Sequence, residues 1–85
     1  MNFLFALLAR FGSPTVELKQ ISEEFFGIKP KTAEQQVKAG AFPIPAFKLR
    51  DSERSPTLVR LEDLAEYMNE RYQEAADEWA SVNRR

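Results

Sequence analysis

The first apolar stretch of the chain has the spacing of an amphipathic helix. Its apolar positions form one wide face, made of Phe3, Leu4, Leu7, Leu8 and Phe11. This spacing predicts a helix over residues 2–11, with Asn2 as its N-cap and an end at Gly12. A secretory signal would carry a basic residue before such a run, and none is present, so we interpret the segment as a core helix. A short extended piece is expected at residues 15–17.

A second helix is predicted from apolar residues at steps of three and four. These residues are Leu18, Ile21 and Phe25. They define a helix over residues 18–26. Gly27 follows where helices commonly end in a left-handed residue, which glycine adopts without strain.

A third helix follows after only a few residues. Pro30 stands near its start, where the missing N–H costs little. The helix is predicted over residues 31–39, and its Ala33 and Val37 are four apart and face inward. Two helices joined by so short a turn indicate a helix-turn-helix over residues 18–40.

The segment after the third helix favours extended backbone. Pro43 and Pro45 exclude a helix, and residues 46–50 alternate between apolar and basic side chains. Residues 58–61 are the expected partner strand, and the polar residues 51–56 form the loop between them. The pattern predicts a β-hairpin wing over residues 46–61.

The longest helix is predicted over residues 62–82. Its apolar stripe continues to the end, although a domain of this size has a core large enough to cover only the first half. We expect the second half to pack on a second copy of the chain, and the alternative is that it folds back on the first helix. The residues expected at the dimer contact are Tyr72, Ala75, Ala76 and Trp79.

Composition narrows the possible chemistry. The 85 residues make one small domain, and they include no cysteine and no histidine. Disulfides and thiolate catalysis are therefore excluded, and a zinc site would need carboxylates alone. There is also no nucleophile–base pair and no glycine-rich phosphate loop, so we expect no enzyme, no cofactor and no metal.

Charge is unevenly distributed, although the net charge is only −1. Residues 1–28 carry two basic and three acidic groups, residues 29–60 seven and three, and residues 61–85 three and seven. The net charges are therefore −1, +4 and −4. Because salt screens surface fields beyond about 8 Å, a basic region can attract phosphate on a nearly neutral protein.

The basic region coincides with the predicted third helix and wing. A helix of this length fits the major groove, where glutamine pairs with adenine and a threonine methyl contacts thymine. Lysine and arginine suit phosphates, and a wing arginine can enter a narrow minor groove. The candidate DNA contacts are Lys29, Lys31, Thr32, Gln35, Gln36, Lys38, Lys48, Arg50, Arg54 and Ser55. Glu34 must lie on the flank of this surface, or it weakens binding.

The sequence also resembles a known family. The segment GIKPKTAEQQVKAGAFPIPAFKL, followed after a polar loop by VRLEDLAEYM, is similar to the MerR-like and excisionase winged-helix class. Within that class it most resembles the phage-related pyocin activator PrtN family. That family likewise begins with a short apolar helix, here MNFLFALLARFG, and ends with a helix like LEDLAEYMNERYQEAADEW.

The resemblance implies a fold and a function. The expected fold is mainly α with a small β-hairpin wing, a winged helix-turn-helix with a long C-terminal helix. The implied function is sequence-specific DNA binding that activates phage-derived genes. Recognition residues carry over to Lys31, Thr32, Gln35 and Gln36, and the wing to residues 48–55. The two glutamines depart from the family pattern, which often has arginine or lysine there.

Two other functions remain open on the sequence. An excisionase-like factor would share the fold but would bend DNA beside an integrase. A protein-binding module would use the acidic last helix against a basic partner. The leading hypothesis implies double-stranded DNA, a second copy of the chain and RNA polymerase as partners. It also implies a cytoplasmic location and no membrane.

Overall fold

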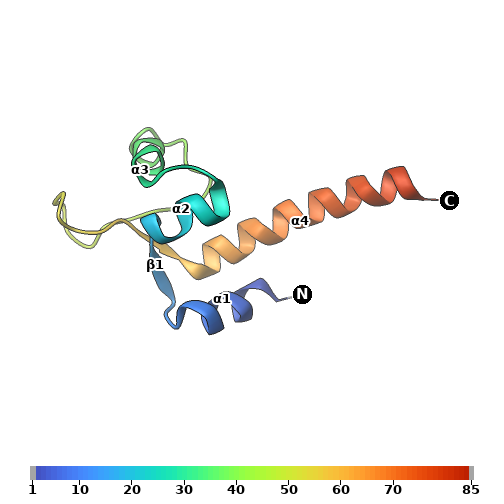
Figure 1. The fold of residues 1–85 in the computed structure, drawn as a ribbon, viewed down its shortest axis with the longest axis horizontal. Coiled ribbons are helices and arrows are strands. Elements are labelled where there is room, and N and C mark those ends of the chain that lie inside the picture. Colours follow the sequence, from blue (N-terminus) through green and yellow to red (C-terminus); the bar gives the residue numbers. More distant parts are fainter. Residues whose placement is uncertain (1, 85) are drawn as a thin grey trace.

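The computed structural model describes residues 2–84, which form four helices and a two-stranded sheet (Figure 1). In chain order the elements are α1 (Phe3–Phe11), β1 (Thr15–Glu17), α2 (Leu18–Phe26), α3 (Pro30–Lys38), β2 (Leu58–Arg60) and α4 (Leu61–Asn83). Each predicted helix is found, with ends within about one residue of those expected from the sequence. The mainly helical fold with a long C-terminal helix is confirmed.

The ends of α1 and α2 follow from individual residues. The side-chain oxygen of Asn2 accepts a hydrogen bond from the backbone N–H of Phe5 at 3.1 Å, so Asn2 caps α1. At the start of α2, Glu17 and Gln20 form a reciprocal capping box. Gly27 ends α2 with φ 68°, and its N–H donates to the carbonyl of Glu23 at 3.1 Å. The chain thus turns sharply between α2 and α3.

The core draws side chains from every element. Its fully buried members include Leu18 and Ile21 of α2, Val59 of β2, and Leu61 and Leu64 of α4. The helix α1 packs along the first half of α4, and α2 packs against α3. The start of α4 therefore holds α1 and the helix-turn-helix in one body (Figure 1).

The sheet differs from the predicted hairpin. Strand β2 forms its ladder with β1, antiparallel, and Val16 pairs with Val59 at its centre. Residues 46–50 contribute only a single bridge, between Phe47 and Leu58. The N–H of Phe47 donates to the carbonyl of Leu58 at 2.9 Å, and the N–H of Leu58 donates to the carbonyl of Phe47 at 2.7 Å. The wing is therefore a loop closed by one bridge, and the expected pairing of residues 46–50 with 58–61 was too long.

Prolines limit this bridge to one pair. In the register of Phe47 and Leu58, the next hydrogen-bonded pairs would be Leu49 with Pro56 and Pro45 with Arg60. Proline has no N–H to donate, so neither pair can form both of its hydrogen bonds. The other edge of β2 pairs with β1, and the central residues of this pairing, Val16 and Val59, are both buried.

The second half of α4 protrudes from the body. The molecule extends 55 Å along its longest axis, and Figure 1 shows α4 running well beyond the other elements. Trp79 and Val82 are 67% and 79% exposed, so this half does not fold back on α1. The alternative of a fold-back within one chain is wrong, because α1 is too short to cover the helix past Tyr72. The ring of Phe3 meets that of Tyr72 edge-on, with 6.5 Å between centroids.

Candidate nucleic-acid interface

Helix α3 presents a polar face because one small side chain anchors the opposite face. Ala33 is fully buried against α2, which turns Gln35 and Lys31 outward. Thr32 and Lys38 are exposed as well. The short turn before α3 leaves its first residues accessible at the surface. Four of the predicted α3 contacts therefore lie on one accessible side of the helix.

Gln36 is placed differently from its neighbour. It precedes Val37, which packs against the core, and it is half-buried on the flank of α3. Helical geometry separates consecutive residues by about 100°, so Gln35 and Gln36 cannot both point straight outward. The expectation of two outward glutamines was wrong for Gln36, and Gln35 is the more exposed of the two.

The wing tip is a compact turn centred on Ser52. The N–H of Ser52 donates to the carbonyl of Arg50 at 2.9 Å, and the N–H of Arg54 donates to the Ser52 hydroxyl at 3.2 Å. Lys48 donates from its ammonium to the carbonyl of Ser52 at 3.4 Å. These bonds shape the loop while leaving Arg50 and Arg54 exposed. Ser55, in contrast, is half-buried.

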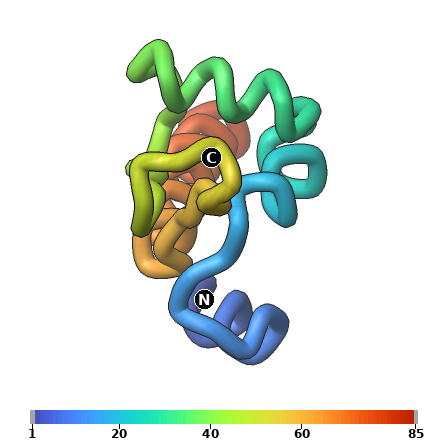
Figure 2. Tube along the Cα trace, turned by 90° about the vertical axis from the view of Figure 1, so that its left-hand side faces the viewer, coloured from blue at the N-terminus to red at the C-terminus, as the bar shows by residue number. Residues whose placement is uncertain are grey.

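The first turn of α3 and the wing face each other across a groove. Lys31 and Glu34 line one side, and Arg54, Ser55 and Thr57 line the other. The groove has a volume of about 330 Å³. Figure 2, viewed from this end of the molecule, shows α3 and the wing loop close together. Of the predicted contacts, Lys31 on α3 and Arg54 and Ser55 on the wing therefore line the same groove.

Thr57 is a site residue that the sequence did not reveal. Its hydroxyl donates a 2.9 Å hydrogen bond to a carboxylate oxygen of Glu34, and Thr57 is itself buried. This bond joins the wing to α3 and holds the Glu34 carboxylate in the groove between them, not on the outer flank expected from the sequence. No sequence signal identifies the pair, because the two residues are 23 positions apart.

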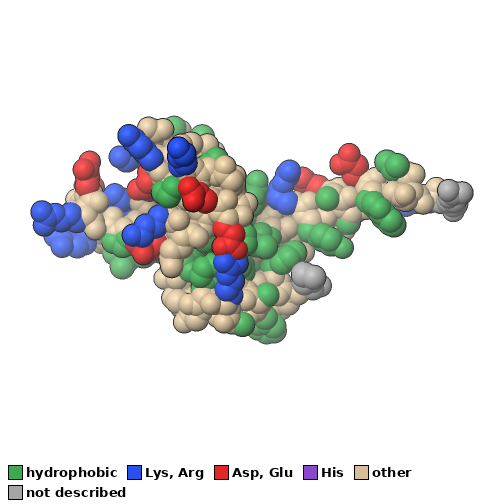
Figure 3. Space-filling view, viewed as in Figure 1, with side chains coloured by type: hydrophobic (Ala, Val, Ile, Leu, Met, Phe, Trp, Pro, Cys, Tyr) green, Lys and Arg blue, Asp and Glu red, His purple; other side chains and the backbone are tan. Residues whose placement is uncertain are grey.

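Most cations of this surface have no acidic partner. Within residues 2–84, none of the six lysines and arginines predicted on α3 and the wing takes part in an ion pair. They are Lys29, Lys31, Lys38, Lys48, Arg50 and Arg54, and all six are exposed. Figure 3 shows several lysine and arginine side chains at the α3 and wing end of the molecule, with acidic side chains between them. The charge of the six cations is available to an external anion.

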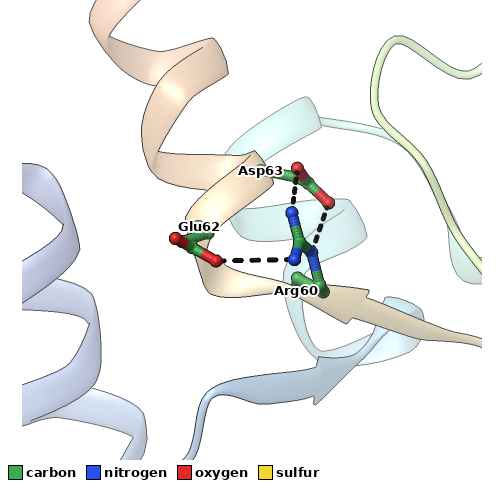
Figure 4. Close-up of polar contacts among 3 residues, drawn as sticks. All are labelled: Arg60, Glu62 and Asp63. Atoms are coloured by element: carbon green, nitrogen blue, oxygen red, sulfur yellow. Dashed lines mark hydrogen bonds and ion pairs between the residues drawn. The ribbon is translucent and has the colours of Figure 1, made fainter.

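Arg60 belongs to the basic segment but is already neutralised. Its guanidinium donates two hydrogen bonds to Asp63, of 3.0 and 3.1 Å, and lies 3.5 Å from Glu62 (Figure 4). The hydrogen bonds from Arg60 lower the pKa of Asp63. This cluster stabilises the start of α4 and takes one of the seven basic residues of the segment out of the surface.

Comparison with known proteins identifies the family. A family model described as "Pyocin activator protein PrtN" matches residues 3–75. The chain belongs to the PrtN pyocin activator family. No curated protein and no solved structure matches the chain.

The PrtN family match covers every element of the candidate interface. Residues 3–75 include α1, the helix-turn-helix, the wing and the first half of α4. The protruding end of α4 lies largely outside the match. There, Trp79 is exposed and Ala76 is half-buried, while Tyr72 and Ala75, within the match, are exposed. In the described part of the chain, no helix is both long and apolar enough for a membrane crossing.

Proposed function

We propose that this member of the PrtN family is a DNA-binding regulator that activates pyocin-type genes in the cytoplasm. The observation that carries the proposal is a set of six exposed cations on α3 and the wing, around the outward Gln35, that form no ion pair within the described part of the chain. The family match supports the biological setting. The protein binds and does not catalyse.

Each part of the surface has a separate role in this proposal. Helix α3 enters the major groove, where Gln35 bonds to an adenine edge and Thr32 contacts a thymine methyl. The lysines of α3 and the arginines of the wing bind phosphates and set the orientation of the helix. Sequence preference therefore depends on Gln35, whereas overall affinity depends on the cations.

The activator acts as a homodimer and contacts RNA polymerase. A second copy doubles the number of half-sites read and so raises specificity. The excisionase-like alternative uses the same surface but binds several adjacent sites and bends the duplex. Binding without sequence preference, together with strong bending, would favour that alternative.

The test compares two duplexes by fluorescence anisotropy. One carries the chain's own upstream region or a pyocin-gene promoter, and the other carries the same bases in scrambled order. We expect clear preference for the first. Gln35→Ala should weaken binding to the true site by about 1–3 kcal/mol and leave binding to the scrambled duplex nearly unchanged. Arg54→Ala should weaken binding to both duplexes similarly.

A matched control distinguishes the loss of sequence recognition from a general loss of structure. Gln73→Ala removes an exposed glutamine of α4, far from the interface in sequence and on another element, and should change neither affinity. Absence of binding to either duplex at about 50 mM salt, where phosphate contacts are strong, contradicts the proposal. Equal losses on both duplexes for Gln35→Ala would show that α3 does not read the sequence.

A further inference from the structure

One apolar stripe runs the whole length of α4, and only half of it is covered. Its residues follow alternating steps of four and three, which is the repeat of a helix that packs along another helix. They are Leu61, Ala65, Met68, Tyr72, Ala75, Trp79 and Val82. Leu61 and Ala65 are buried in the body, whereas Tyr72 and Trp79 are 59% and 67% exposed. Figure 3 shows hydrophobic side chains continuing along the protruding half.

A second apolar feature lies where the stripe leaves the body. A groove of about 420 Å³ opens between α1, α2 and α4. Its lining includes Phe3, Phe25, Phe26, Tyr67, Met68 and Arg71. Grooves of this size, lined by aromatic rings, hold apolar groups well.

The charges along α4 favour a particular partner for the stripe. Glu70, Glu74 and Asp77 lie on the face opposite the stripe, so they point away from any helix packed on it. The flank beside the groove carries Arg71 and Glu78, one of each sign and seven residues apart. Arg71 also donates a 2.8 Å hydrogen bond to Glu74 of its own helix, an exposed ion pair that costs little to exchange for a carboxylate of a partner. A helix that carries Arg71 and Glu78 in reverse order along this flank would pair both charges.

In a second α4 that runs antiparallel to the first, Arg71 and Glu78 occur in this reverse order. When Tyr72 lies opposite Ala75 of the second copy, the repeat brings Trp79 of one helix opposite Met68 of the other. In this register Arg71 lies beside Glu78 of the second copy, and two-fold symmetry repeats the pair. A parallel arrangement would instead place Arg71 beside Ala76 and Glu78 beside Asn83, with no ion pair.

We propose that two copies of this chain pair through antiparallel α4 helices, with Trp79 of each copy inserted into the aromatic groove of the other. Met68 then lies beneath the indole, and Arg71 pairs with Glu78 across the interface on both sides. The inference rests on the homodimer part of the proposed function and adds its geometry. It does not depend on DNA binding.

The arrangement sets a minimum spacing for the two α3 helices. The two-fold axis passes between Tyr72 and Ala75, about 12 residues from the start of α4, or about 18 Å at 1.5 Å per residue. The two starts of α4 are then about 36 Å apart, which equals about one turn of duplex DNA. Because α3 lies at that end of α4 (Figure 1), the half-sites would be separated by one turn or more.

The test uses sedimentation equilibrium together with the fluorescence of the single tryptophan. The wild-type chain should have the mass of two copies at high concentration, and its emission should move to shorter wavelength as the dimer forms. Arg71→Glu and Glu78→Arg each place like charges across the interface and should raise the dimer dissociation constant by about tenfold. The double variant, with both changes, restores opposite charges and should recover the wild-type value.

Controls make the outcome decisive. Asp77→Lys changes a charge on the outer face and should leave the dimer intact. The mass of a single copy at every concentration overturns the proposal and assigns the stripe to another partner. A dimer that neither single variant weakens, or that the double variant fails to restore, overturns the antiparallel register. A monomeric variant that still prefers the native DNA fragment would leave the proposed function standing.

Discussion

At the scale of single residues, the position of one carboxylate affects the charge of the candidate interface. Glu34 lies among lysines on α3 and would repel phosphate if it pointed outward. The hydroxyl of Thr57 holds it at the groove by a 2.9 Å hydrogen bond. The sequence showed that Glu34 needed an explanation, but only the folded chain brings its partner from the end of the wing.

Replacing this carboxylate by an amide should strengthen DNA binding. Glu34→Gln keeps an oxygen that accepts the hydrogen bond from Thr57, and it removes one negative charge beside Lys31. We expect the dissociation constant for any duplex to fall by about two- to threefold at low salt. Anisotropy titrations measure it, with the exposed Glu66→Gln on α4 as the control. Weaker binding would mean that Glu34 itself contacts a base.

At the scale of elements, local chemistry explains the helix ends better than it explains the wing. Asn2 and Gly27 occupy the cap positions that the sequence indicated. For the wing, the alternating pattern of residues 46–50 predicted a full strand, but Pro45 and Pro56 interrupt its ladder. That effect depends on the register of the pairing, which the pattern alone does not define.

The turn between α2 and α3 should be sensitive to a side chain at Gly27. Its φ of 68° is left-handed, and a Cβ there would meet no atom within 4 Å, so only backbone strain opposes substitution. Gly27→Ala should cost about 1 kcal/mol of the free energy of unfolding, or about 4–8 °C in Tm. Thermal unfolding followed by circular dichroism measures the change. Glu23→Ala, at an exposed helical position, should stay close to wild type; equal stability of all three chains would contradict the strain.

At the scale of the whole molecule, charge is separated along the length of the chain. The α3 and wing end carries six cations that form no ion pair within residues 2–84, and α4 carries seven of the thirteen acidic groups. The net charge of −1 therefore combines a positive end, with seven basic and three acidic groups in residues 29–60, and an acidic α4. Because screening limits the reach of exposed charges to about 8 Å, the acidic helix does not cancel the field at the opposite end.

The dependence of the DNA-binding constant on salt concentration should show how many cations of the positive end contact phosphate. If all six unpaired cations contact phosphate, the logarithm of the binding constant should fall against the logarithm of salt concentration with a slope of about −5 per copy. Arg50→Gln should make the slope shallower by about one. Titrations at several salt concentrations measure both values. A slope near zero would show that the basic surface does not face phosphate, despite its exposure.

The sequence by itself determined the helices, their caps, the charge division and the family resemblance. All of these depend on residues close together in the chain, where spacing and local hydrogen bonding decide the outcome. The tertiary structure alone decided which strand pairs with β2, that Gln36 lies on the flank, that Thr57 holds Glu34, and that the second half of α4 stays uncovered. These features depend on strand register and on packing between segments far apart in the sequence. Local patterns do not define them, because the same apolar surface can be buried against several different segments.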